Sequence, residues 1–85
     1  MGLVLGVDGG NTKAIALVAR RDGSIVGAAR RPGSADVYAG REAALELIRG
    51  VVADALTTAE ASVADVGTAV FSLAGADWPE DIALL

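Results

Sequence analysis

The sequence contains no cysteine and no histidine among its 85 residues. Without cysteine the chain can form neither a disulfide nor a thiolate metal site, which permits a reducing compartment. Without histidine it lacks the most common catalytic base near neutral pH. Aromatic residues make up only 4% of the sequence, so the 53% hydrophobic content is mainly Ala, Val, Leu and Ile. This composition is typical of a covered sheet in an α/β protein.

Long apolar runs and an excess of basic charge are also missing. No segment approaches the roughly 20 apolar residues that span a bilayer, and the N-terminus has no basic region followed by an apolar stretch. The net charge of −4 disfavours binding to a phosphate backbone. We therefore expect a cytoplasmic protein whose partner is a small molecule, with neither nucleic acid nor a membrane as partner.

Apolar segments separated by turn residues predict three strands in the first part of the chain. Residues 3–8 are apolar up to Asp8, as expected of a strand buried on both faces, and further strands are expected at 14–19 and 25–29. Asp22-Gly23 predicts a hairpin with a type I′ turn between the second and third strands. The three strands are therefore expected to form an antiparallel meander, which residues 30–33 close.

A helix and a fourth strand are expected next. Between residues 40 and 60 the apolar residues recur at helical spacing, at Leu45, Ile48, Val52, Leu56 and Ala59. Gly50 costs about 1 kcal/mol relative to Ala within such a helix. The helix forms a right-handed crossover to a strand at residues 68–74, which should lie parallel to the first strand. The fold class is therefore α/β with a mixed sheet.

A second helix is expected to begin near the end of the sequence. Asp77 is a suitable N-cap, Pro79 lies in the first turn, and Glu80 completes a capping box. No C-terminal signal follows, and the sheet is apolar on both faces although only one helix precedes it. We expect residues 1–85 to be the N-terminal portion of a larger domain that is incomplete at its C-terminus.

The segment after the first strand is the strongest candidate site. It consists of Asp8, Gly9, Gly10, Asn11, Thr12 and Lys13. Turn amides, the Thr12 hydroxyl and the Lys13 ammonium could hold a phosphate, and Asp8 suits hydrated Mg²⁺. The pattern is neither a P-loop nor the dinucleotide-binding fingerprint. An ordinary hairpin turn, with Gly and Asn at positive φ, is the alternative, and these residues alone leave both open.

Two segments together, residues 6–13 and 72–77, resemble the BadF/BadG/BcrA/BcrD-type ATPases and N-acetylglucosamine kinases. These proteins lie within the superfamily of acetate and sugar kinases, heat-shock chaperones and actin, and the resemblance covers the whole chain. It implies a ribonuclease H-like mixed sheet that is a truncated half-domain of an actin-like ATPase fold. Family members often carry Gly where Asn11 stands, a mild departure because Asn tolerates left-handed backbone conformations.

The resemblance also implies a function. The full-length protein would be an ATP- and Mg²⁺-dependent kinase for N-acetylglucosamine, glucosamine or a related hexose. Residues 8–13 would form its first phosphate loop, with Asp8 organising Mg²⁺ and Thr12 near the γ-phosphate. The catalytic base, the second phosphate loop and the adenosine site are expected beyond Leu85, so the 85 residues alone should not turn over ATP. A homodimer is one assembly open to the full-length protein.

Sugar contacts are implied at four further residues: Asp36, Gly75, Ala76 and Asp77. In the kinases that the sequence resembles, Asn commonly occupies the position of Asp36, and Asp cannot donate a hydrogen bond as Asn does. The substrate therefore stays open. A purely structural reading also exists, in which Asp36 caps backbone donors of a loop and Asp77 caps a helix.

Two other functions remain open. An ATPase that activates a radical CoA-dehydratase resembles the same motif, but it needs cysteines for an iron–sulfur cluster, and this sequence has none. A ribonuclease H-like two-metal nuclease would group Asp8 with Glu42 or Glu46 and with Asp77. The acidic charge and the donor-rich turn beside Asp8 argue against the nuclease.

Overall fold

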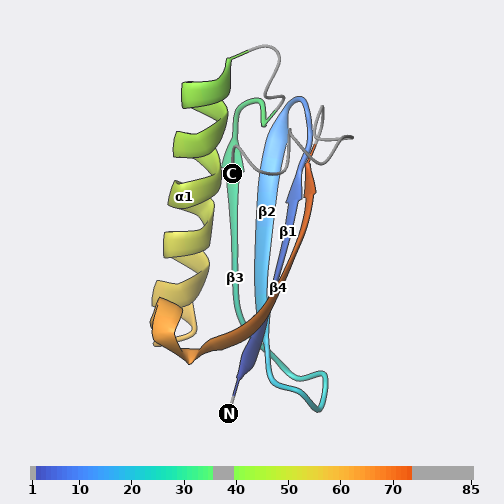
Figure 1. Ribbon diagram of the computed structural model, residues 1–85, viewed down its shortest axis with the longest axis vertical. Coiled ribbons are helices and arrows are strands. Elements are labelled where there is room, and N and C mark those ends of the chain that lie inside the picture. Colours follow the sequence, from blue (N-terminus) through green and yellow to red (C-terminus); the bar gives the residue numbers. More distant parts are fainter. Residues whose placement is uncertain (1, 36–39, 74–85) are drawn as a thin grey trace.

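In the computed structural model, which describes residues 2–35 and 40–73, four strands form one mixed sheet with a helix on one face (Figure 1). The elements in order are β1 (Leu3–Gly9), β2 (Lys13–Ala19), β3 (Ile25–Pro32), α1 (Arg41–Thr58), a 3-10 turn (Val63–Asp65) and β4 (Val66–Leu73). Strands β1 to β3 are antiparallel, whereas β4 lies parallel to β1, so the strand order is β3-β2-β1-β4. The predicted α/β fold with its meander, crossover helix and parallel fourth strand is confirmed.

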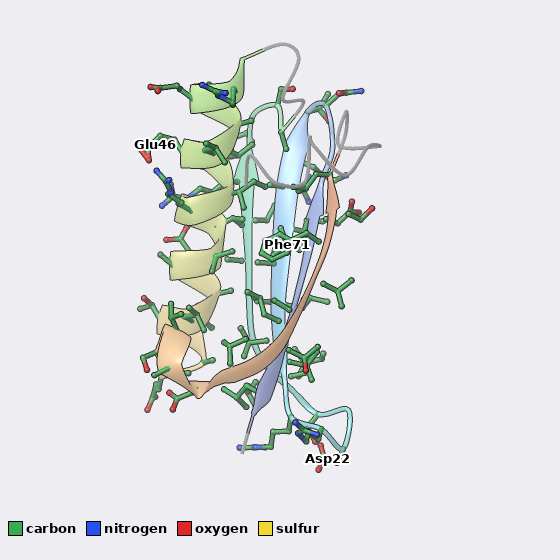
Figure 2. The ribbon with its side chains drawn as sticks, viewed as in Figure 1. Asp22, Glu46 and Phe71 are labelled. Carbon is green, nitrogen blue, oxygen red and sulfur yellow. The ribbon has the colours of Figure 1, made fainter. Side chains whose placement is uncertain are left out.

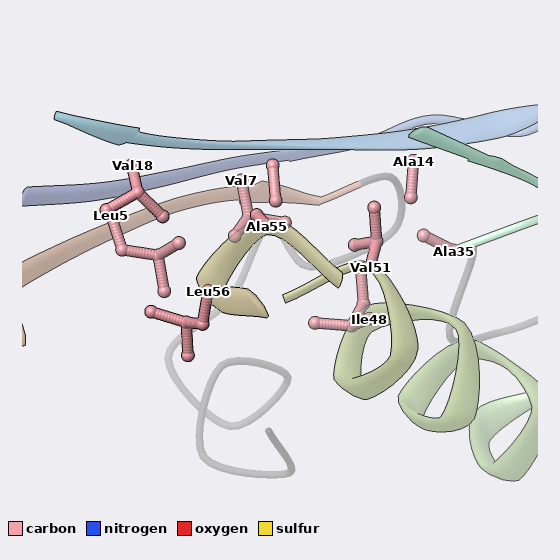
Figure 3. Packing of buried hydrophobic residues seen from close by; sticks show 10 residues of the cluster. Leu5, Val7, Ala14, Val18, Ala35, Ile48, Val51, Ala55 and Leu56 are labelled. Atoms are coloured by element: carbon pink, nitrogen blue, oxygen red, sulfur yellow. The ribbon is translucent and has the colours of Figure 1, made fainter. Parts of the chain in front are cut away.

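The hydrophobic core lies between α1 and the sheet (Figure 3). Alternate residues of β1 and β2 point toward the helix, and the buried ones are Leu5, Val7, Ala14, Ala16 and Val18. Val18 on β2 and Val51 on α1 are the largest fully buried side chains among the described residues. Because the period of a strand is two, residues such as Asp8, Ile15 and Leu17 lie on the face away from α1.

The buried face of α1 differs from the predicted one. It consists of Ala44, Ile48, Val51, Ala55 and Leu56, whereas the predicted Leu45, Val52 and Ala59 are only half-buried. The reason is how closely α1 approaches β3. A Cβ atom at Gly27 would lie 2.5 Å from the Ala55 carbonyl oxygen, and such a close contact favours small residues over leucine.

The predicted β2–β3 hairpin is confirmed, but its predicted type I′ turn is wrong. Such a turn needs positive φ at both central residues, whereas Gly23 has a φ of 95° and Asp22 is not in the left-handed region. Gly23 N donates to Arg20 O (2.9 Å) and Arg20 N donates to Ser24 O (2.8 Å). The hydrogen bonds that Asp22 accepts from the Ser24 hydroxyl and amide also lower the pKa of Asp22. The connection is therefore a three-residue loop with glycine last.

An ion pair between Arg31 and Asp54 joins β3 to α1. Arg31 Nε donates to Asp54 Oδ2 (2.6 Å) and its Nη2 donates to Asp54 Oδ1 (3.1 Å). These bonds raise the pKa of Arg31 and lower the pKa of Asp54. A Cβ atom at Gly50 would overlap the Arg31 guanidinium. Gly50 therefore makes room for the ion pair within the helix.

Helix α1 packs mainly on β2 and β3, so β4 is exposed (Figure 1). Phe71 of β4 points toward the side on which α1 lies but remains 45% exposed (Figure 2), and Val70 on the opposite face is 62% exposed. Within residues 2–35 and 40–73, no helix is long and apolar enough to cross a membrane. The second helix expected from Asp77 lies outside the described residues.

Candidate phosphate and metal site

The turn between β1 and β2 contains the candidate phosphate site. Strand β1 ends at Gly9 and β2 begins at Lys13, and Gly10 N donates to Lys13 O (2.9 Å) to close the turn. Asp8, Asn11, Thr12 and Lys13 are all exposed. The predicted turn at the end of the first strand is therefore confirmed, and its polar side chains are accessible from solvent.

Gly9 has a role that the sequence does not reveal. In the described part of the chain, left-handed φ values occur only at Gly23, Gly33 and Glu60. The hairpin-turn alternative expects positive φ at the Gly and Asn residues of this turn, but none of them has it. Glycine is instead required at position 9 because there is no room for a side chain. A Cβ atom at Gly9 would lie 2.6 Å from Ala35 Cβ and 2.7 Å from Leu73 Cδ2, whereas one at Gly10 would lie 3.6 Å from its nearest neighbour.

A segment after β3 is hydrogen-bonded to the turn. Gly33 N donates to Thr12 O (2.9 Å), and Ala35 N donates to Gly10 O (2.8 Å). Ala35 is 1% exposed and belongs to the core cluster. These bonds fix the turn to the residues that directly precede Asp36. Sequence patterns gave no signal for these backbone contacts, because any residue except proline can make them.

The predicted sugar contacts all belong to segments that follow β3 and β4. Asp36, Gly75, Ala76 and Asp77 lie outside the described residues. The part of the second motif that is described, Ser72 and Leu73, ends β4 beside Asp8 and Gly9 of β1. The described ends of the two motifs are thus brought together at the same edge of the parallel β1–β4 pair.

The surroundings of Asp8 are compatible with Mg²⁺. The Asp8 carboxylate lies at a strand end and is open to water on the face away from α1. Magnesium usually keeps several water ligands and takes one or two carboxylates together with substrate phosphates. No group of three or more His, Cys, Asp or Glu side chains able to hold a metal occurs in residues 2–35 and 40–73. Within these ranges, Asp8 is the carboxylate that directly precedes the turn, Thr12 lies in the turn, and Lys13 begins β2.

The carboxylate cluster of a two-metal nuclease is not formed by the described residues. Glu42 and Glu46 are exposed on α1 and belong to no such group with Asp8. Figure 2 shows Glu46 on the outer side of the helix, away from the sheet. Because α1 and Asp8 lie on opposite faces of the sheet, neither glutamate can share a metal ion with Asp8.

A cavity of about 700 Å³ lies at the opposite end of the sheet from the turn. It is lined by the start of β1, the start of β4 and the segment that follows α1, and Arg20 and Glu60 are among the lining residues. None of the predicted site residues lines this cavity. The turn between β1 and β2, in contrast, presents its polar side chains on an exposed surface.

Comparisons with known proteins agree with this geometry. A model of the BadF/BadG/BcrA/BcrD ATPase family matches residues 5–78, which include both the turn and the end of β4. No match was found among curated proteins. Among solved structures, the chain is similar to a Chromobacterium violaceum protein provisionally described as an N-acetylglucosamine kinase, with a TM-score of 0.76 and 19% sequence identity. The similarity covers 98% of this chain and 30% of that one, and at this identity it shows the fold. This chain belongs to the BadF/BadG/BcrA/BcrD ATPase family.

Proposed function

We propose that this chain is the N-terminal part of an ATP- and Mg²⁺-dependent sugar kinase that acts on N-acetylglucosamine, glucosamine or a related hexose. The observation that carries the proposal is the exposed Asp8 at the end of β1, followed directly by an exposed polar turn, in a chain of an ATPase family. The provisional description of the structural neighbour as an N-acetylglucosamine kinase supports a sugar as the phosphate acceptor.

Each group of the turn has a role in this proposal. The Asp8 carboxylate accepts hydrogen bonds from the water shell of the metal, and the Thr12 hydroxyl and Lys13 ammonium contact phosphate oxygens. When bound, Mg²⁺ supplies charge neutralisation at the transferring phosphoryl group. The protein contributes mainly positioning. The hydrogen bonds from Gly33 and Ala35 hold the turn in place, and residues 36 and 75–77 are the proposed sugar contacts.

A coupled assay of ADP release on the full-length protein tests the substrate class. ATP turnover should rise on addition of N-acetylglucosamine or glucosamine, and the sugar phosphate should form in equal amount to ADP. Rates that do not change across a panel of hexoses and amino sugars would refute the kinase. If the protein showed such sugar-independent turnover together with the absorbance of an iron–sulfur cluster, the proposed function would change from a sugar kinase to an activator of a radical dehydratase.

Asp8→Ala tests the role of the turn in the full-length protein. The substitution should reduce turnover at least about 100-fold, as the loss of one charge-stabilising contact does in other enzymes. Glu46→Ala is the matched control, because it removes the same charge from an exposed position on the other side of the sheet. Near-normal turnover of Asp8→Ala, with both variants folded, would overturn the proposed metal role.

A further inference from the structure

One row of residues crosses the face of the sheet away from α1 at the level of Asp8. Strand register places Arg30 beside Ile15, Ile15 beside Asp8, and Asp8 beside Ser72. The next row toward the start of β1 has no polar side chain and consists of Ala28, Leu17, Gly6 and Val70. Polar side chains therefore return on β1 and β4 together, at the end where the phosphate turn begins.

The Ser72 hydroxyl is available to form a hydrogen bond with the Asp8 carboxylate. Both residues are exposed, and within the described ranges neither side chain makes a hydrogen bond or an ion pair. Neighbouring strands lie about 4.8 Å apart, and residues paired across them project from the same face. Rotation of the serine hydroxyl about its Cα–Cβ bond therefore brings it within reach of the carboxylate or of a water molecule bound to it.

We propose that Ser72 is a positioning residue of the Asp8 site. Its hydroxyl donates a hydrogen bond to one Asp8 carboxylate oxygen, and the other oxygen is left to accept hydrogen bonds from the water shell of the metal. The bond holds the carboxylate in one rotamer, so less conformational freedom is lost when metal and nucleotide bind. This inference rests on the proposed function, because it assigns Ser72 to the same site.

Thr68 provides a matched control on the same strand. It is exposed, carries a hydroxyl, and lies on the same face as Ser72, paired with Val4 two rows from Asp8. Four residues of strand separate the two hydroxyl groups, which corresponds to roughly 13 Å. A general effect of removing a hydroxyl from β4 would appear in Thr68→Ala as well, whereas an effect on the Asp8 site would not.

The test is a Mn²⁺ titration of the full-length protein with ADP, followed by the EPR signal of free Mn²⁺. Ser72→Ala should weaken Mn²⁺ binding about tenfold, the effect of one hydrogen bond to a charged group. Ser72→Thr, which restores the hydroxyl, and Thr68→Ala should both bind within about twofold of the parent.

Asp8→Ala in the same titration separates the two possible failures. If Asp8→Ala abolishes binding but Ser72→Ala matches the parent, the Ser72 inference fails and the metal role of Asp8 stands. An equal loss in Ser72→Ala and Thr68→Ala would also overturn the inference, since it would show a general effect on β4. If Asp8→Ala binds Mn²⁺ normally, the proposed metal site and the Ser72 inference both fail.

Discussion

Gly9→Ala should destabilise the protein by crowding the contact between the β1–β2 turn and the core. The new methyl group would lie 2.6 Å from Ala35 Cβ, 2.7 Å from Leu73 Cδ2 and 3.1 Å from Ile48 Cδ1. Carbon atoms normally approach to about 3.5–4.0 Å, so the closest of these contacts is short by about 1 Å. The methyl group therefore requires its neighbours to move.

The loss in the free energy of unfolding depends on which of these neighbours can move. Leucine and isoleucine side chains can rotate, but the Ala35 methyl is fixed to a backbone that donates a 2.8 Å hydrogen bond to Gly10 O. Overpacking of a core costs about 1–3 kcal/mol, and loss of the hydrogen bond adds about 1 kcal/mol. We expect a loss of about 2 kcal/mol or more, which should lower the unfolding temperature and the urea midpoint.

Thermal and urea unfolding, compared between variants of the same protein, measure this loss. Gly6→Ala is the matched control, because a Cβ atom at Gly6 of the same strand meets nothing within 4 Å. It should be neutral or stabilise slightly by reducing the freedom of the unfolded chain. Equal stability of Gly9→Ala and Gly6→Ala would refute the conclusion that Gly9 is required by space.

Two further predictions concern the ion pair between β3 and α1. The hydrogen bonds from Arg31 lower the pKa of Asp54 below its usual 3.8, so the pair adds stability that is present above pH 3.8 and is lost as the pH falls through the folded-state pKa. Asp54→Asn should therefore lower the unfolding temperature at pH 7, and the difference should shrink steadily below pH 3.8; a constant difference would contradict this. Gly50→Ala should stabilise an Arg31→Ala background by about 1 kcal/mol through helix propensity but stabilise the parent less. Equal gains in both backgrounds, measured by urea unfolding, would show that the guanidinium does not occupy the space at Gly50.

The elements that a local sequence pattern specifies were predictable from the sequence. The continuous apolar run of β1, the Asp-Gly signal of the hairpin and the helical spacing of α1 are properties of single segments, and the elements that they predict all form. Strand β4 was predicted parallel to β1 because a crossover helix leaves little other choice. The position of Asp8 at a strand end followed directly from these elements.

The features that could not be predicted from the sequence depend on contacts between segments. The buried face of α1 is set by its close approach at Gly27, and the need for Gly9 is set by Ala35 and Leu73. The partner of Arg31 lies on another element, so its two hydrogen bonds have no local signal. In each case the reason for the glycine or the charge lies in residues far away in the sequence.

The two outer strands of the sheet differ in how they meet solvent. β3 carries Arg30, Arg31 and Pro32 and an irregular register opposite Val18 and Ala19, which are features that discourage pairing with another chain. β4 has no charged residue and no proline, and its outer edge is unpaired in the described sheet. Pairing with another chain is thus discouraged at the β3 edge, whereas the β4 edge has no such protection within the described residues. When residues 1–85 are produced by themselves, the light scattering of the solution should rise steeply with protein concentration. Val70→Lys should suppress that rise.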